Sequence, residues 1–468
     1  MNNYENKIPE SLKKMGKIFE QNGFKSYLVG GAVRDMLMKK TPSDYDVTTN
    51  AMPEDVMRIF KKVIPTGIEH GTVTVHFMSE EIEVTTFRTE SSYSDGRHPD
   101  SVSYAATINQ DLSRRDFTIN AIAISLTDFK IVDPFLGQND IKNKIIKTVG
   151  LAKERFLEDG LRPIRAIRFK SQLNFSIEEN TFSELFNPEI LEKIKSISVE
   201  RFRDEFLKIM KAEKPSDSLK IMEQTGILKI FIPELLEGRG CIQNDSRGYH
   251  IFDVLDHNFY ACDGAPREKP LVRVAALFHD IGKPKAKTER FENGAKIINF
   301  YNHEIYSEQI AKKVLQNLKF SNAEIDFICN LIKNHMFNYE SKCKNSAIRR
   351  FIVKVGSQNI DDLIDLRLAD MYGKYNEPVK KDSSACLKLL ELKERISEIL
   401  SENAALSLKD LKINGKDLMQ NGIEQGPILG KILKELFDCV LEDPELNDYE
   451  KLLKIAKNLY DKYSILRV

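Results

Sequence analysis

The alternation of hydrophobic and polar residues divides the chain into a mixed first part and a helical remainder. Short β-type runs occur at residues 25–31, 71–77, 82–88 and 130–135, with helical stretches between them. From Leu151 onward, apolar residues follow the helical period, as at residues 191–210 and 452–463, and β-type runs nearly vanish. The pattern therefore predicts a small α+β head, a mixed sheet with helices, followed by a long all-helical body.

The length of 468 residues suggests roughly two to four domains. Breaks in the helical pattern occur at Pro215, at Gly238–Gly240 and at Asn376–Ser384. We expect a head at residues 1–148, a helical neck at 149–235, a helical domain at 236–380 and a helical tail at 381–468.

Charge and cysteine content exclude several classes of protein. Lys plus Arg and Asp plus Glu both number 70, so any grip on nucleic acid must come from local basic surfaces. The six cysteines include no C-x-x-C pair, which argues against a zinc ribbon or a disulfide framework and fits a reducing cytoplasm. Because no apolar signal core and no run of about 18 apolar residues occurs, we expect a cytoplasmic protein with no membrane partner.

A glycine turn followed by two carboxylates is the first chemical pattern. Gly30 and Gly31 end an apolar run and open a helical one that contains Arg34, an arrangement suited to phosphate. Asp44 and Asp46 alternate around a tyrosine, so on a β-strand both carboxylates would lie on one face. Such a pair favours Mg²⁺, and two metal ions can activate a hydroxyl and stabilise a leaving pyrophosphate. Taken singly, each motif is more often a structural turn or a pair of solvated acids.

The segment LVGGAVRDML followed by DYDVTT resembles the head of class II tRNA nucleotidyltransferases and bacterial poly(A) polymerases, within the polymerase-β-like superfamily. The resemblance implies that Gly31 and Arg34 hold a nucleoside triphosphate. It also implies that Asp44 and Asp46 are catalytic and ligate magnesium. Glu83, on the β-type run IEVTTFR, is a further candidate carboxylate for the metal.

Two segments in the rest of the head bear on the substrate. SRRDFTINAIA (residues 113–123) is similar to the family segment that distinguishes ribose from deoxyribose, and Arg115 and Asp116 suit a 2′-hydroxyl or a triphosphate oxygen. The polar stretch from Arg88 to Val102 predicts a mobile loop of the kind that, in the family, accompanies addition of the final A. Residues 65–77 resemble the tRNA-directed members more than the poly(A) polymerases.

The stretch ERFLEDGLRPIRAIRF places Asp159, Arg162, Arg165 and Arg168 three residues apart, on one face of a helix. An aspartate accepts and an arginine donates hydrogen bonds, so together they can imitate a Watson–Crick edge. The resemblance implies that Asp159 and Arg162 bind the base and that Arg165 and Arg168 lie nearer the triphosphate. Pro163 departs from the family pattern, and it predicts that Asp159 and Arg162 lie at the helix entrance.

A second centre is predicted farther along the chain. The segment RVAALFHDIGKP, with histidines and an aspartate around it, resembles the HD superfamily of metal-dependent phosphohydrolases. The resemblance implies a second divalent metal, with hydrolysis of 2′,3′-cyclic phosphates as the family-based activity; a fold that serves only as a tRNA platform is the alternative. The expected ligands are His257, His279, Asp280 and Asp370, with His303 and His335 as additional candidates.

The tail also resembles HD-bearing tRNA nucleotidyltransferases. It carries Gly415, Gly422, Gly426 and Gly430 around a helix start, which fits contact with RNA phosphates or helix caps in a packed bundle.

These observations together predict template-independent addition of CCA to a tRNA 3′ end from CTP and ATP. Alternatives are A-only or CC-only addition, poly(A) synthesis, and an HD-type phosphohydrolase as the main activity.

Overall fold

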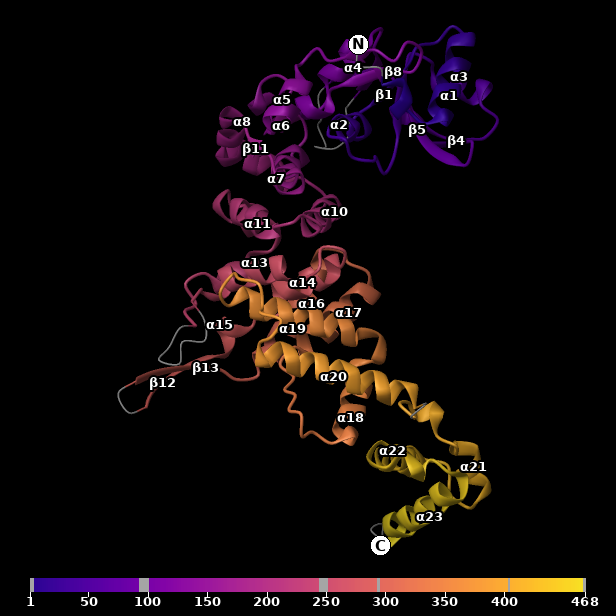
Figure 1. Ribbon diagram of the computed structural model, residues 1–468, viewed down its shortest axis with the longest axis vertical. Coiled ribbons are helices and arrows are strands. Elements are labelled where there is room, and N and C mark those ends of the chain that lie inside the picture. The colour runs from indigo at the N-terminus through magenta and orange to yellow at the C-terminus, as the bar shows by residue number, and fades with distance from the viewer. Residues whose placement is uncertain (1–3, 92–100, 244–250, 293–294, 403–404, 466–468) are drawn as a thin grey trace. The chain divides into compact units, whose positions relative to one another are not determined.

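A computed structural model describes residues 4–91, 101–243, 251–292, 295–402 and 405–465 (Figure 1). The chain forms two compact units, one of residues 1–236 with 317–319, the other of residues 237–316 with 320–468. None of the helices in these described ranges is long and apolar enough to cross a membrane.

The first unit begins with a seven-stranded sheet in the order β3-β4-β5-β2-β1-β8-β9. Only β2 and β5 pair in parallel within this sheet, and the other neighbours are antiparallel, so the sheet is mixed as predicted. The strands are β1 (Ser26–Val29), β2 (Asp46–Thr49), β3 (Val63–Gly67), β4 (Thr72–Phe77), β5 (Glu80–Thr86), β8 (Ala123–Ser125) and β9 (Ile131–Val132). The helices of the head are α1 (Glu10–Gln21), α2 (Gly31–Leu37), α3 (Pro53–Ile59), α4 (Ile108–Ser113) and α5 (Gly137–Asn143).

Strand alternation gives the central strands one apolar and one polar face. Val47 of β2 and Ile82 and Val84 of β5 point into the main core of the head, which also holds Phe19 of α1. Successive side chains of a strand point to opposite faces. The polar residues between these apolar positions are therefore displayed together on the other side of the sheet.

Helices follow the sheet in the rest of the first unit. In α10, Phe202, Phe206 and Ile209 recur at helical spacing and are fully buried, which explains why this segment folds as an amphipathic helix. The helices are α6 (Ala152–Glu158), α7 (Leu161–Leu173), α8 (Glu179–Ser183), α9 (Pro188–Lys195), α10 (Val199–Met210), α11 (Pro215–Gln224) and α12 (Ile227–Phe231), and the short strands β10 (Ile145–Ile146) and β11 (Ser176–Ile177) pair in parallel.

The second unit is mainly helical. Its helices are α13 (Val254–Gly264), α14 (Pro270–Phe278), α15 (Lys283–Ala286), α16 (His303–Asn317), α17 (Asn322–Asn334), α18 (Asn345–Val355), α19 (Ile360–Gly373), α20 (Ser384–Ser401), α21 (Gly415–Gln420), α22 (Pro427–Glu442) and α23 (Tyr449–Ile465). A side chain at Gly373 would place its Cβ 2.8 Å from the backbone oxygen of His257, so this glycine lets α19 pack closely on α13. That packing brings two elements with predicted metal ligands together.

Three sequence-based expectations about local structure were wrong. The segment from Arg88 to Val102 is not all loop, because β6 (Arg88–Ser91) pairs with β7 (Ser101–Tyr104); the remainder of the predicted loop, 92–100, lies outside the described residues. A hairpin, β12 (Lys287–Glu292) with β13 (Ala295–Phe300), interrupts the predicted all-helical body. Finally, β2 starts at Asp46, so Asp44 precedes the strand instead of lying on it.

Candidate active sites

The polar face of the central strands carries the predicted catalytic carboxylate. Asp46 pairs in register with Glu83 on the parallel neighbour β5, so the two acids occupy adjacent positions on one face. Both line an open cavity of about 300 Å³. Glu83 was the lesser candidate in the sequence, but the structure places it directly beside Asp46. Asp44 accepts a hydrogen bond from Ser43 at 3.0 Å and is not among the residues that line this cavity.

The electrostatics of this pair favour a cation. Partial removal from water and the negative charges of Glu83 and Asp44 together raise the pKa of Asp46 to about 6, although the positive charge of Arg115 opposes them. A carboxylate whose negative charge is destabilised by neighbouring acids is the kind of ligand that a divalent cation stabilises. The residues present therefore fit a metal ion, and Asp44 acts on the site through its charge.

The glycine turn brings backbone close to this carboxylate. Gly30 has φ +72°, a left-handed conformation that favours glycine. A Cβ at Gly30 would lie 3.2 Å from Nη1 of Arg115 and 3.6 Å from Oδ2 of Asp46. Gly31 follows as the first residue of α2, and a Cβ there would lie 3.6 Å from Arg34. The turn thus leaves room for the two charged side chains at the cavity.

Arg34 is held by two partners inside the first unit. It is buried, its guanidinium pairs with Asp35 at 2.8 Å, and it donates to Oδ1 of Asn120 at 2.9 Å. It is not among the cavity-lining residues. In this structure Arg34 joins α2 to the segment after α4, so a direct contact with the triphosphate stays a prediction.

Asp116 is the best-connected carboxylate of the cavity. It accepts hydrogen bonds from Nε of Arg165 at 2.8 Å, from Nδ2 of Asn120 at 3.1 Å and from its neighbour's backbone N–H, on Phe117, at 2.8 Å. Burial alone would raise the pKa of this carboxyl, but Arg165 and the hydrogen bonds outweigh it and lower the pKa to about 2. The Asp116–Arg165 pair is therefore charged and ties the head to α7.

Asp159 lies between two helices, which corrects the expectation of a single helical face. Helix α6 ends at Glu158 and α7 begins at Leu161, so Asp159 is outside both. Its Oδ1 accepts from the backbone N–H of Leu161 at 2.9 Å, and its Oδ2 pairs with Arg201 at 2.7 Å. Arg162 is in the first turn of α7, as the following proline predicts, and donates to Glu158 at 2.5 Å.

Arg168 lies behind the cavity and does not line it. Its Nε pairs with the buried Glu205 at 2.6 Å, and burial lowers its pKa to about 10. Its guanidinium lies 4.0 Å from the ring centre of Phe169, and those of Arg34 and Arg165 lie 5.2 and 5.4 Å from the same ring. Three cations from two elements therefore surround one aromatic side chain.

Several residues of this site were missed in the sequence. Arg88 and Arg114 line the cavity beside Arg115. Asp111, which is fully buried, pairs with Arg114 at 2.9 Å and with Arg115 at 3.3 Å and so orients both. The adjacent arginines were visible in the sequence, but their common partner one helical turn earlier was not singled out.

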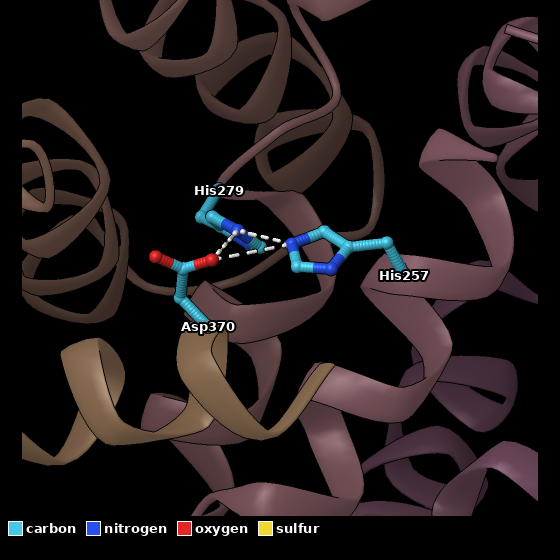
Figure 2. A group of neighbouring side chains, drawn as sticks. All are labelled: His257, His279 and Asp370. Atoms are coloured by element: carbon cyan, nitrogen blue, oxygen red, sulfur yellow. Dashed lines mark hydrogen bonds and ion pairs between the residues drawn. The ribbon is translucent and has the colours of Figure 1, made fainter. Parts of the chain in front are cut away.

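The second predicted centre is brought together in the second unit. His257 comes from α13, His279 and Asp280 follow α14, and Asp370 comes from α19. Figure 2 shows His257, His279 and Asp370 pointing toward one another, with 3.1 Å between the Nε2 atoms of the two histidines and 3.4 Å from Nε2 of His257 to Oδ1 of Asp370. All these side chains are buried. A second group of ligand atoms that lie close together consists of His279, Asp280 and His335.

Asp280 faces both halves of this cluster. Its Oδ2 lies 3.3 Å from Nε2 of His257 and 3.2 Å from that of His279, and its Oδ1 lies 3.1 Å from Nε2 of His303 and 3.7 Å from that of His335. Burial disfavours the charged form, yet the histidines and a nearby lysine hold the pKa of Asp280 well below its usual range. One carboxylate thus connects all four imidazoles.

Hydrogen bonds orient three of these imidazoles. Nδ1 of His279 lies 2.7 Å from the carbonyl of Ala276, that of His303 2.8 Å from Phe300, and that of His335 2.7 Å from Ile332. A ring that donates its Nδ1–H to a carbonyl presents a lone pair on Nε2. The Nε2 atoms of His303 and His335 are 3.2 Å apart, so two lone pairs face each other unless a cation lies near them.

The pKa values differ between two of these rings. Burial and the neighbouring His279 lower the pKa of His335 to about 3, so this ring is neutral. Burial also disfavours charge on His279, but Asp280 and Asp370 outweigh it and raise the pKa to about 9, so a cation that binds Nε2 of this ring would displace a proton from it. The donor set of imidazole and carboxylate fits a transition-metal or magnesium-type cation.

The head and the helices after it define a polymerase-β-like nucleotidyltransferase. A family model described as "Poly A polymerase head domain" matches residues 26–147. A model described as "Probable RNA and SrmB- binding site of polymerase A" matches residues 174–238, and a model described as "tRNA nucleotidyltransferase domain 2 putative" matches residues 291–456. The expected fold class, a mixed-sheet head with a mostly helical remainder, is confirmed.

Relatives narrow this class to one family. A CCA-adding enzyme of Lactobacillus johnsonii is 35% identical over 431 residues, which cover 91% of each chain. One of Lactobacillus delbrueckii subsp. bulgaricus is 47% identical over 208 residues, 44% of this chain and 52% of that enzyme. The crystal structure of a Bacillus stearothermophilus CCA-adding enzyme in complex with CTP matches with a TM-score of 0.73 at 25% identity, over 98% of this chain and 99% of that one. The chain belongs to the family of CCA-adding enzymes, which are tRNA nucleotidyltransferases and depend on a divalent metal.

Proposed function

We propose that this enzyme builds or repairs the 3′-terminal CCA of tRNA from CTP and ATP without a nucleic-acid template. The observation that carries the proposal is the pairing of Asp46 with Glu83 on the polar face of the sheet, in a cavity that is otherwise rich in cations. Its lining includes Arg88, Arg114, Arg115, Arg162 and Arg165. Acids for a metal and arginines for a triphosphate are the components that nucleotidyl transfer needs.

In the proposed reaction, the oxygen of the RNA 3′-hydroxyl forms a bond to the α-phosphorus, and the bond from this phosphorus to the β-phosphate oxygen breaks. Pyrophosphate leaves, and the hydroxyl proton passes to solvent. Asp46, with Glu83 and the charge of Asp44, would hold magnesium, which supplies neutralisation of the developing charge. Arg115 lies beside Asp46, where it can bind the triphosphate and lower the repulsion between the phosphates and the acids.

Base selection would take place at Asp159 and Arg162. Cytosine and adenine both present an exocyclic amino group, which can donate a hydrogen bond to a carboxylate, and a ring nitrogen, which can accept one from a guanidinium. Arg201 holds one oxygen of Asp159, and the start of α7 holds the other, so the carboxylate is oriented before a base arrives. A uracil or guanine would leave these polar groups without matching partners, and that mismatch costs binding energy.

The test is incorporation of labelled nucleotide into tRNA that ends before CCA, with CTP and ATP added separately and together. Both nucleotides together should give CCA, and Asp46→Asn should lower the rate by at least about 100-fold. Asp128→Asn, an exposed acid paired with Lys130 elsewhere in the head, is the control that should retain activity. Other products would replace the proposal with a different activity. Addition of A alone to tRNA ending in CC would indicate an A-adding enzyme, CC alone a CC-adding enzyme, and long A tails a poly(A) polymerase.

We also propose that the cluster of His257, His279, Asp280 and Asp370, with His303 and His335, binds a second divalent cation and hydrolyses phosphate esters. The converging lone pairs described above favour this over a purely structural cluster. The bound cation would supply Lewis acidity for attack of water on phosphorus.

Metal content and phosphodiester hydrolysis together test this second proposal. Protein loaded with Mn²⁺ or Ni²⁺ and desalted should retain metal by mass spectrometry and should hydrolyse bis(p-nitrophenyl) phosphate. His279→Ala should lose both properties and keep nucleotidyl transfer, which the first unit carries; thiol labelling of the six cysteines, all of them in the second unit, is the control for folding of that unit. Retention of no metal by the wild type would leave the second unit as a helical platform only.

A further inference from the structure

Two neighbouring cavities open beside the histidine–aspartate cluster. The first, of about 330 Å³, is bordered by Asp280, His303, His335 and Asp370 of the cluster. The second, of about 400 Å³, is lined from the segment after α17 and from the start of α20, and contains no member of the cluster. Arg367 and Lys374 line both cavities. The two spaces are therefore adjacent and share a wall made of two cations on and just after α19.

The charges along these cavities are one-sided. The carboxylates that line the first cavity are Asp280 and Asp370, both of which belong to the cluster. Among the residues described, no acid lines the second cavity. The cations are Lys283 in the first cavity, Arg367 and Lys374 in both, and Lys388 in the second. A path of cations that continues beyond the cluster fits a ligand with more than one negative charge.

These cations differ in how firmly the protein holds them. Lys283 is buried and pairs with Asp280 at 2.6 Å, so it belongs to the cluster. Lys388 pairs with Glu340 at 2.7 Å, and both side chains are exposed, so water screens the attraction between them. A phosphate entering the second cavity can therefore compete for Lys388 at little cost.

Aromatic side chains accompany the cations in both cavities. Phe300 and Tyr301 line the first, and Phe337 and Tyr339 line the second. The hydroxyl of Tyr339 donates to Glu391 at 2.8 Å, so its ring is fixed in position. Aromatic rings interleaved with cations are the features by which proteins bind single-stranded nucleic acid, through stacking of bases and contacts to phosphates.

We propose that the ester hydrolysed at this centre is the terminus of an oligonucleotide and not a free mononucleotide. The terminal phosphate lies in the first cavity against the cluster, and the preceding nucleotide lies in the second, with its phosphate near Lys374 and Lys388. This inference rests on the phosphate-ester hydrolysis proposed above. In the reaction, an oxygen of water bonds to the terminal phosphorus, the bond from phosphorus to the leaving ester oxygen breaks, and the proton of water passes to that oxygen.

The test compares two substrates that carry the same reacting group. The Mn²⁺-loaded full-length protein is assayed with adenosine 2′,3′-cyclic phosphate and with a triadenylate that ends in a 2′,3′-cyclic phosphate. We expect kcat/KM to be at least tenfold higher for the triadenylate, and this preference to appear in KM. Equal kcat/KM values for the two substrates would overturn the inference and leave the hydrolase proposal intact. Failure to hydrolyse either substrate or bis(p-nitrophenyl) phosphate would instead remove the hydrolase proposal and the inference with it.

Substitutions locate the added subsite. Lys388→Gln should reduce the preference for the triadenylate about tenfold, and Lys374→Gln gives a second, independent variant. Lys393→Gln is the matched control, because Lys393 lies on the same helix, pairs with Asp361 at 2.8 Å and lines neither cavity.

Salt dependence separates a phosphate contact from a structural effect. Let K be the binding constant for the triadenylate. Each contact between a cation and a phosphate that a substitution removes should reduce the slope of log K against log salt concentration by about 0.7. The inference is refuted if Lys388→Gln and Lys374→Gln both retain the wild-type preference and the wild-type slope.

Discussion

Replacement of Asp116 by asparagine should lower the free energy of unfolding of the first unit, by an amount that follows from the pKa of the Asp116 carboxyl. The pKa of this carboxyl falls from the ordinary 3.8 to about 2 because Arg165 and two further donors stabilise its charge inside the protein. At about 1.4 kcal/mol per pKa unit, the difference corresponds to about 2 kcal/mol at pH 7. Because the folded-state pKa is the lower one, this stabilisation is complete above the unfolded value and is lost as the pH falls from about 4 to about 2.

The assay must read the two units separately, since a chain of two units need not unfold in one transition. Urea unfolding followed by pulsed hydrogen exchange and mass spectrometry resolves peptides of residues 1–236 from those of residues 237–468. All six cysteines lie in the second unit, so thiol labelling gives an independent probe of that unit alone. With a slope of about 2 kcal/mol per molar urea, Asp116→Asn should lower the midpoint of the first unit by about 1 M.

Asp128→Asn is the control for this measurement, because Asp128 is an exposed acid paired at 2.8 Å with the exposed Lys130. Its effect should stay within about 0.5 kcal/mol. The reasoning is refuted if Asp116→Asn leaves the midpoint of the first unit unchanged at pH 7, or if its effect persists undiminished at pH 3.

Two further substitutions probe the nucleotidyl-transfer site. Gly30→Ala should cost about 1–2 kcal/mol in backbone strain and lower nucleotide incorporation, because the new methyl group would meet Arg115 at 3.2 Å. Gly23→Ala is the control, because it has comparable strain at φ +80° but no atom within 4 Å of the new methyl group, and it should keep full activity. Equal losses of activity in both variants would contradict a local effect at Gly30. Arg201→Met should relax the choice of base more than it lowers the rate with CTP, because it frees one oxygen of Asp159. The measurement is incorporation of UMP and GMP relative to CMP. Unchanged selectivity with a uniform loss of rate would show that Arg201 only supports the fold.

The sequence predicted the elements of the head better than the neighbours of its side chains. Alternating runs gave the positions of β1, β4 and β5, because a half-buried strand must alternate. The rank of Glu83 could not be predicted, since its proximity to Asp46 depends on the register of two parallel strands that are 37 positions apart in the chain. Burial of Arg34 against Asn120 is likewise a tertiary event that no local pattern encodes.

For the histidine–aspartate cluster too, the sequence predicted some features and missed others. Among the described residues, the four histidines that lie within 4 Å of Asp280 are all ones that the sequence analysis had named. The hairpin of β12 and β13 was missed because β12 consists mostly of exposed polar and charged residues and carries little apolar signal. The partner of Asp159 was missed because Arg201 lies on a later helix.

The ring of Phe169 has a consequence for how substitutions in this enzyme combine. Arg34, Arg165 and Arg168 all approach it, so the head and α7 share one aromatic surface. Side chains that depend on a common neighbour do not respond independently. A smaller aliphatic residue at position 169 would therefore act on all three guanidinium groups at once, and changes at any two of these arginines would be expected to deviate from additivity.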